Sequence, residues 1–302
     1  YLIMSFFMII GIFATMVSEE PKIKKNFQSD NHIKFLLTIF VSVVGFIFLY
    51  SLINNPFGKE DIILKFLFST IRLVICFFFA YLIINFLILI KFASKNRITK
   101  IYLAPITNFL NRYGKIAFLI LLLISLYRIA DIVMGVMANI FYLEKGYKIS
   151  EIATFSKFFG VFATILGGFV GGYCSFKFGT MKTLFFGAFI AALSNLLFAW
   201  LAISPISINF LIAVITADNI SSGFAGAAFV IYLSGLTSIK FTATQYALFS
   251  SIMLFMPKLI AGYAGGWVDI MGYSYFFSLT ALLGLPVLFL IIWIGKIAPI
   301  KN

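Results

Sequence analysis

Residues 116–140 read IAFLILLLISLYRIADIVMGVMANI, an apolar run that Arg128 and Asp131 interrupt near its centre. About 20 consecutive apolar residues are enough for a helix to cross the hydrocarbon core of a bilayer. Only two residues in this run are charged, whereas a soluble helix would carry polar residues along one whole face. The stretch therefore predicts a membrane-spanning helix with a charged pair inside it.

The rest of the chain repeats this pattern. Hydrophobic residues make up 62% of the 302 residues and charged residues 11%, whereas about 25% of an average soluble domain is charged. The apolar segments predict nine membrane helices, at 1–17, 35–53, 63–90, 116–140, 152–175, 183–203, 208–236, 243–268 and 274–295. We expect an all-α, polytopic membrane protein whose main partner is the lipid bilayer.

Basic residues indicate the orientation of these helices. Of the 23 lysines and arginines, five lie within the predicted spans and three in outer loops (Lys59, Lys145 and Lys148), which leaves fifteen on the opposite side. This bias is the positive-inside pattern, and it places 18–34, 91–115 and the C-terminus in the cytoplasm. The net charge of +13 therefore reflects topology, and we expect no nucleic-acid partner.

Charges at the centre of a bilayer cost at least about 2.5–3.5 kcal/mol each, so they usually face a protein interior. Arg128 and Asp131 are three residues apart and share a helix face. Arg128 is about 18 Å into its helix, at the depth where carriers bind solutes. Asp218 lies at mid-depth in another span, where an unpaired carboxyl could carry a proton. Structural ion pairs or interhelical hydrogen bonds are the alternative reading for these residues.

Other charged residues within the spans are less specific. Lys157 lies near the outer end of its helix and could snorkel to the interface, as could Lys65. Lys258 follows Pro257, which removes a helix hydrogen bond and permits a bend, so the two form a candidate hinge and anion contact. Arg72 needs a partner that the sequence does not identify.

Enzymatic chemistry has little support in the sequence. The single histidine, His32, lies in a polar loop, and no group of residues has the spacing of metal ligands. A membrane-embedded transferase would need a general base or metal ligands near one interface. Three acidic residues of the outer loops, Glu144, Glu151 and Asp269, are isolated in short loops. We expect a protein that is not an enzyme and has no cofactor or metal.

Four motifs in order carry a family resemblance. They are YRIAD at 127–131, FATILGG at 162–168 with Lys157 upstream, Asp218-Asn219 followed by GFAGAAFV at 223–230, and FTATQYAL at 241–248 running on to Gly262-x-x-Gly265-Gly266-Trp267. Together they resemble the muropeptide permease (AmpG) family of major facilitator superfamily carriers. The resemblance covers roughly 115–295.

This resemblance implies a domain organisation. Residues 116–295 would be the C-terminal six-helix bundle and 1–17 the last helix of an N-terminal bundle, with a cytoplasmic loop at 18–34. Residues 35–90 would be a two-helix central insertion, 91–115 a basic cytoplasmic linker, and 296–302 a cytoplasmic tail. Because the chain opens on an apolar segment without Met, we expect a truncated start, with the N-terminal half of the carrier as a missing partner.

The resemblance also implies a function, proton-coupled import of anhydromuropeptides across the bacterial inner membrane by alternating access. Asp131 and Asp218 would then be proton sites, and Arg128, Lys157 and Lys258 could meet the solute's carboxylates. Its hydroxyls and amides could contact Asn195, Asn219 and Gln245. Two alternatives stay open: a carrier of another anionic solute, such as an acyl-CoA, and a degenerate paralogue without transport.

A short loop resembles the cytoplasmic signature of major facilitator carriers. It contains Gly172, Lys177, Gly179 and Lys182 at matching positions. The acidic residue usual in this signature is missing, which puts in doubt the gating ion pair that the family forms there.

Overall fold

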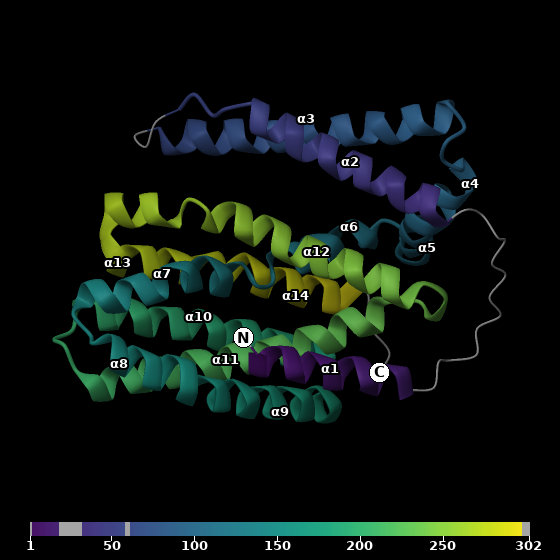
Figure 1. Ribbon diagram of the computed structural model, residues 1–302. Coiled ribbons are helices and arrows are strands. Elements are labelled where there is room, and N and C mark those ends of the chain that lie inside the picture. Colours follow the sequence, from purple (N-terminus) through teal and green to yellow (C-terminus); the bar gives the residue numbers. More distant parts are fainter. Residues whose placement is uncertain (1, 18–31, 58–60, 298–302) are drawn as a thin grey trace.

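The computed structural model describes residues 2–17, 32–57 and 61–297. Every element assigned within these ranges is helical (Figure 1), as the composition predicts. The elements are α1 (Leu2–Val17), α2 (His32–Leu52), α3 (Ile62–Leu89), α4 (Lys95–Ile98), η1 (Thr99–Leu103), α5 (Ala104–Tyr113), α6 (Ile116–Leu126), α7 (Ile129–Lys145), α8 (Ile149–Ile152), η2 (Ala153–Phe159), α9 (Gly160–Phe178), α10 (Thr180–Ile203), α11 (Ile208–Leu236), η3 (Ile239–Phe241), α12 (Thr242–Ala261), α13 (Ala264–Leu283) and α14 (Leu285–Ile297).

Seven helical stretches within the described ranges are long and apolar enough to cross a membrane, so the chain is a multi-pass membrane protein. They are Ile33–Leu52, Ile63–Leu89, Ile116–Lys145, Ile149–Phe178, Thr180–Ile203, Ile208–Leu236 and Ala264–Ile297. Two of the nine predicted spans are not among the seven. The helix in the first, α1, has 16 residues, and the other corresponds to α12 and the start of α13.

The end of the chain turns at a glycine. Gly272 lies inside α13 at φ 77° and ψ 167°, where two helices join across a kink. L-residues with a side chain rarely adopt this conformation, so glycine is required there. The kink falls between the predicted spans 243–268 and 274–295, and a further break at Gly262 and Tyr263 separates α12 from α13.

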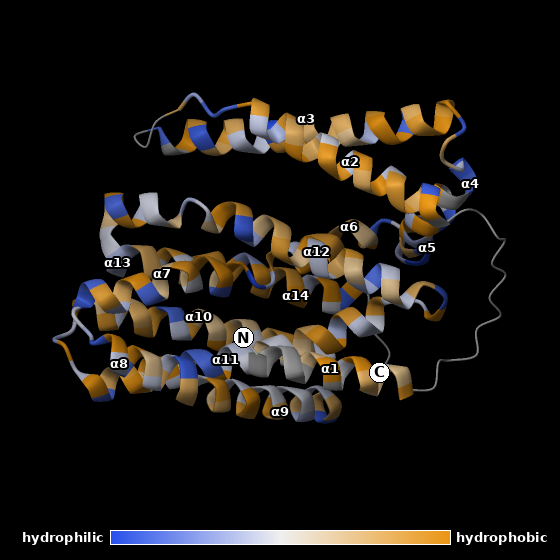
Figure 2. Cartoon of the chain, viewed as in Figure 1, coloured by the Kyte–Doolittle hydropathy of each residue, from blue (hydrophilic) through white to orange (hydrophobic). Residues whose placement is uncertain are grey.

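The helices form two layers (Figure 1). The α2–α3 hairpin lies apart from a larger bundle that contains α6 to α14. Hydrophobic residues cover the length of both layers, and hydrophilic residues lie both near the helix ends and at a few positions within the bundle (Figure 2). Only 11% of the α2 span and 6% of the α3 span is buried, which leaves their apolar side chains for lipid. The domain boundaries stay predictions, and the predicted loop 18–34 and tail 296–302 lie mostly outside the described residues.

An aromatic core holds the bundle together near one end. The Phe277 ring lies 5.0 Å from the Phe141 ring and 5.3 Å from the Phe198 ring, and all three side chains are buried. Such edge-on and tilted pairs stabilise a core beyond their buried area. They join α7, α10 and α13, which fixes the frame around the polar residues of the bundle interior.

Helices α9 and α11 pack at glycines. A Cβ atom at Gly167 would lie 2.2 Å from the Ile220 carbonyl oxygen, and one at Gly223 would lie 2.1 Å from the Thr164 carbonyl oxygen. These separations leave no room for any side chain, so the two backbones touch directly. Small residues permit this close approach in membrane helices. We call this direct contact of α9 and α11 at Gly167 and Gly223 the glycine seam.

Candidate functional site

The helix that contains YRIAD is broken at its centre. Helix α6 ends at Leu126 and α7 begins at Ile129, with Arg128 at φ −97° and ψ 12° between them. Tyr127 fixes one side of the break, because its ring stacks 4.4 Å from that of Phe229 and its hydroxyl donates to the Leu184 carbonyl. The sequence predicts one continuous helix here, and the break was not foreseen.

Arg128 pairs with Asp131 across this break. Arg128 Nε lies 3.0 Å from Asp131 Oδ2, and only 24% and 13% of the two side chains are exposed. A second guanidinium nitrogen, Nη2, donates to Ser222 Oγ on α11 at 3.1 Å. A Cβ atom at Gly226 would lie 3.4 Å from Arg128 Nη1, so this glycine leaves room for the guanidinium. The predicted pair on one helix face is present.

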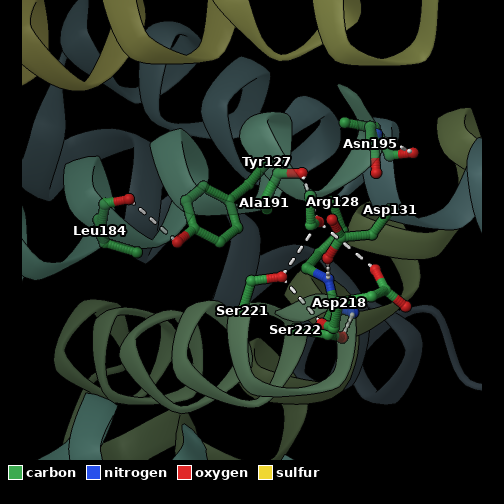
Figure 3. Close-up of polar contacts among 11 residues, drawn as sticks. Tyr127, Arg128, Asp131, Leu184, Ala191, Asn195, Asp218, Ser221 and Ser222 are labelled. Carbon is green, nitrogen blue, oxygen red and sulfur yellow. Dashed lines mark hydrogen bonds and ion pairs between the residues drawn. The ribbon is translucent and has the colours of Figure 1, made fainter. Parts of the chain in front are cut away.

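Asp218 enters the same region from α11. Its Oδ1 accepts a hydrogen bond of 3.5 Å from Ser194 Oγ on α10, and Ser221 Oγ donates to Ser194 Oγ at 3.2 Å. Figure 3 shows Asp218 beside Arg128 and Asp131, between α7, α10 and α11. We call the side chains of Arg128, Asp131, Ser194, Asp218, Ser221 and Ser222 the polar cluster.

Asn195 borders the polar cluster. Its side chain is fully buried, and Nδ2 donates to the Ala130 carbonyl at 3.3 Å, one residue before Asp131. The Asn195 Oδ1 atom is buried and has no hydrogen-bond partner among the described residues. A buried acceptor without a donor costs about 1–3 kcal/mol. A water molecule or a solute donor could satisfy this oxygen only if the surrounding helices opened, because the side chain is fully buried.

The charges of the polar cluster do not cancel. One guanidinium faces two carboxyl groups, so the cluster has one excess negative charge when both carboxyls are ionised. A buried excess charge is costly. Uptake of one proton or one cationic group would neutralise it. No group of three or more metal-ligand residues occurs within the described ranges.

Asn219 points away from the polar cluster. Its Oδ1 accepts from Thr164 Oγ1 at 3.0 Å and its Nδ2 donates to the Ile215 carbonyl at 2.8 Å. Gly160 of α9 lies against the same amide. Asn219, which follows Asp218 in the sequence, therefore joins α11 to α9.

The two candidate lysines lie elsewhere. Lys157 is exposed on the π-helical segment η2. Lys258 is exposed on α12 and lines a pocket beside the α2–α3 hairpin. Pro257 is buried within α12, which continues to Ala261 before it breaks. Neither lysine is hydrogen-bonded to the polar cluster in the part of the chain that the structure describes.

Gln245 has a structural environment. Its Oε1 accepts from the Ser238 backbone at 2.7 Å, and its Nε2 donates to the Pro105 carbonyl at 2.8 Å and to Asn108 Oδ1 at 3.3 Å. The side chain is fully buried and fastens α5 to the start of α12. Arg112 of α5 adds hydrogen bonds to the carbonyls of Leu236 and Thr237. The solute contact suggested for Gln245 therefore has no support in this geometry.

The signature loop is a one-residue turn. Helix α9 ends at Phe178 and α10 begins at Thr180, and Gly179 between them has φ 89° and ψ 150°. Lys177 lies 5.8 Å and 5.5 Å from the ring centres of Tyr173 and Phe178. Lys182 is exposed, and a Cβ atom at Gly172 would meet nothing within 4 Å.

Sequence reasoning missed three polar residues of the site, the serines at 194, 221 and 222. Ser221 and Ser222 follow Asp218 in the polar run of α11, and Ser194 precedes Asn195. Serine is common in membrane helices, so residue type alone gives no signal. Their role follows from which helices pack together.

Comparison with known proteins supports the motif reading. The chain is 36% identical over 192 residues to "Putative transporter AmpG 4" of Rickettsia felis, and the match covers 64% of this chain and 46% of the relative. Its counterpart in Rickettsia conorii is 36% identical over 191 residues, which cover 63% and 46%. "Putative transporter AmpG 1" of Rickettsia bellii is 35% identical over 191 residues, which cover 63% and 47%.

These relatives confirm the resemblance to AmpG-type transporters that the motifs predict. All three are named as transporters, which fits a protein that is not an enzyme. The chain spans about half the length of the curated relatives it matches. No protein-family model matches it.

Proposed function

We propose that this chain is part of a secondary active transporter that couples solute movement to protons at the polar cluster. The observation that carries the proposal is the meeting of Arg128, Asp131 and Asp218 inside a membrane bundle. Ionisable residues buried in membrane spans most often serve solute or proton pathways. Similarity to proteins named as transporters supports the same class of function.

Charge balance gives the coupling step. With the Arg128–Asp131 pair formed, Asp218 supplies the excess negative charge of the cluster. A proton on either carboxyl would neutralise the cluster, and its release would restore the charge. A solute anion near Arg128 would compete with Asp131 for the guanidinium, which links solute binding to the protonation of the carboxyls.

The helix breaks would act as hinges during alternating access. The bundle helices are interrupted at Arg128 and again at Gly262 and Tyr263. The glycine seam between α9 and α11 is too tight to slide without separating, so these two helices would move as one body. Asp218 would then move with α11 relative to the Arg128–Asp131 pair.

We further propose that the solute is an anhydromuropeptide, imported across the bacterial inner membrane with 91–115 and the C-terminus on the cytoplasmic side. Its carboxylates suit Arg128, and its hydroxyls and amides suit the unpaired Asn195 oxygen. The basic residues of 91–115 and the other inner segments support the orientation. We also propose that residues 116–295 form the C-terminal bundle of the carrier and that this bundle acts together with an N-terminal half.

Proteoliposomes that contain the full-length protein test the proposal. Uptake of labelled anhydromuropeptide under an imposed proton gradient should fall at least about tenfold in Asp131→Asn and in Asp218→Asn, because each loses a titratable group. Glu144→Gln is the matched control, because it also neutralises a carboxylate but lies outside the polar cluster. Glu144 is exposed near the end of α7 and accepts a hydrogen bond from the Tyr273 hydroxyl. Uptake at the wild-type rate in both aspartate variants would falsify the assignment.

A further inference from the structure

A pocket with charged and polar lining residues lies outside the polar cluster, between the α2–α3 hairpin and the bundle. Its volume is about 470 Å³. Helices α2 and α3 contribute Tyr50, Lys65 and Ser69, while α12 and α13 contribute Lys258 and Asp269. Gly262, Gly265 and Gly266 line it where α12 breaks. The pocket is thus built from two layers that are far apart in sequence.

Specific contacts hold the two layers together at this pocket. Tyr263 Oη donates to the Lys65 carbonyl at 3.2 Å, and its ring meets the Phe66 ring edge-on at 5.1 Å. Asn55 Nδ2 donates to the same carbonyl at 3.2 Å and to Ser69 Oγ at 3.0 Å. The backbone beside Lys65 is therefore fixed from both sides, which positions its side chain at the pocket.

The ammonium groups of the two pocket lysines are unpaired in the part of the chain that the structure describes. Within the described ranges, neither the Lys65 nor the Lys258 ammonium makes a hydrogen bond or an ion pair. Two other cations of the chain have partners among the described residues. Lys145 Nζ donates to two carbonyls at 2.7 Å each, and Arg72 lies 3.6 Å from the Tyr50 ring centre and donates to the Tyr50 carbonyl.

The charge of the pocket defines the ligand that would fit it. Two ammonium groups and the Asp269 carboxylate leave one excess positive charge on the lining. A phosphodiester carries one negative charge, and lysine is a common phosphate ligand. The hydroxyls of Tyr50 and Ser69 in the lining could donate to the remaining phosphate oxygens, whereas the Tyr263 hydroxyl already donates to the Lys65 carbonyl.

We propose that this pocket binds the phosphodiester head group of an anionic phospholipid of the phosphatidylglycerol type. Leu73, about two helical turns beyond Lys65, and Leu259, directly after Lys258, also line the pocket and could contact the acyl chains. The exposed apolar faces of α2 and α3 continue this surface. Basic pockets between membrane helices bind lipid head groups in this way. The lipid would join the hairpin to the bundle.

Native mass spectrometry of the full-length protein, released from nanodiscs, measures the lipid that stays bound. Nanodiscs of equal phosphatidylglycerol and phosphatidylcholine content should yield adducts enriched at least about tenfold in phosphatidylglycerol, because only the anionic lipid matches the excess charge. The double variant Lys65→Gln/Lys258→Gln should lose that enrichment. Lys115→Gln/Lys240→Gln removes two exposed lysines elsewhere and should keep it.

A steric variant tests the pocket without a change of charge. A Cβ atom at Gly265 would meet nothing within 4 Å, so Gly265→Leu can place its side chain in the pocket and should displace the lipid. Size-exclusion profiles like those of the wild type establish that each variant is folded. Equal retention of the two lipids by the wild type, or unchanged enrichment in the folded double variant, would overturn the proposal.

The same measurement distinguishes a lipid from a soluble ligand. Inorganic phosphate and glycerol 3-phosphate, added to the protein in neutral-lipid nanodiscs, should not form adducts that depend on Lys65 and Lys258. Saturable adducts of either soluble anion that disappear in the double variant would contradict the lipid assignment. This experiment measures lipid binding and not transport, so its outcome does not depend on the proposed proton-coupled transport.

Discussion

Arg128 Nε and Asp131 Oδ2 lie 3.0 Å apart at the point where α6 stops and α7 starts. The break and the ion pair belong together. Asp131 is in the first turn of α7, where a carboxylate interacts favourably with the unpaired backbone N–H groups of a helix start. The pair therefore stabilises a helix end inside the bundle, and a proton or solute that separates it would also act on the helix break.

A double-mutant cycle measures this coupling. Arg128→Gln and Asp131→Asn should each lower the apparent unfolding midpoint, because each leaves the other charge without its partner, at a cost of about 2–3 kcal/mol. The double variant should be destabilised by less than the sum of the two. Thermal unfolding of the purified protein in detergent gives all four midpoints. Strictly additive shifts would show that the two groups do not interact.

The glycine seam predicts a steric effect. Gly167→Ala should destabilise the protein by about 1–3 kcal/mol, because its Cβ atom would lie 2.2 Å from the Ile220 carbonyl oxygen. Gly172→Ala is the matched control on the same helix, since nothing lies within 4 Å of its Cβ position. Thermal unfolding compares them, and an equal effect of the two substitutions would argue against the direct backbone contact of α9 with α11.

Gln245 should act as a fastener of α5. Gln245→Leu removes the side-chain groups that pair with the Ser238 N–H and the Pro105 carbonyl, at a cost of about 1–3 kcal/mol for buried groups left unpaired. Limited proteolysis should then cleave the segment 91–113 faster than in the wild type. The affinity for solute in proteoliposomes should stay unchanged. A loss of solute affinity without faster proteolysis would instead indicate that Gln245 contacts the solute.

The turn at Gly179 predicts a backbone effect. Its φ of 89° with ψ of 150° is a conformation that residues with a Cβ atom avoid. Gly179→Ala should therefore destabilise the protein by about 1–3 kcal/mol. Lys182→Gln, in the first turn of α10, should change the free energy of unfolding by no more than about 0.5 kcal/mol, as expected for an exposed side chain.

Hydropathy predicts the helices well because the bilayer imposes length and composition together. The predicted spans 183–203 and 208–236 differ from α10 and α11 by three residues or fewer at any end. The break at Arg128 was missed because a charged pair inside an apolar run is compatible with a continuous helix. Part of the basic linker forms α5, which Pro105 near its start could have signalled.

The candidate site was only partly predictable. Arg128, Asp131 and Asp218 stand out in sequence because charges are rare in apolar spans. Lys258 stands out for the same reason, yet it lines the hairpin pocket, since the packing of α2 and α3 on the bundle decides what an exposed lysine meets. Arg72 finds Tyr50 as its partner on the neighbouring helix, a pairing that spacing along the chain does not reveal.

The most direct test of proton coupling compares two transport modes in one variant. Proteoliposomes with Asp218→Asn are assayed for exchange of labelled for unlabelled anhydromuropeptide, and for accumulation driven by a proton gradient. We predict that exchange persists while accumulation falls at least about tenfold, because the solute can still bind but the cluster no longer gains and loses a proton at Asp218. Accumulation at the wild-type level together with normal exchange would contradict the account.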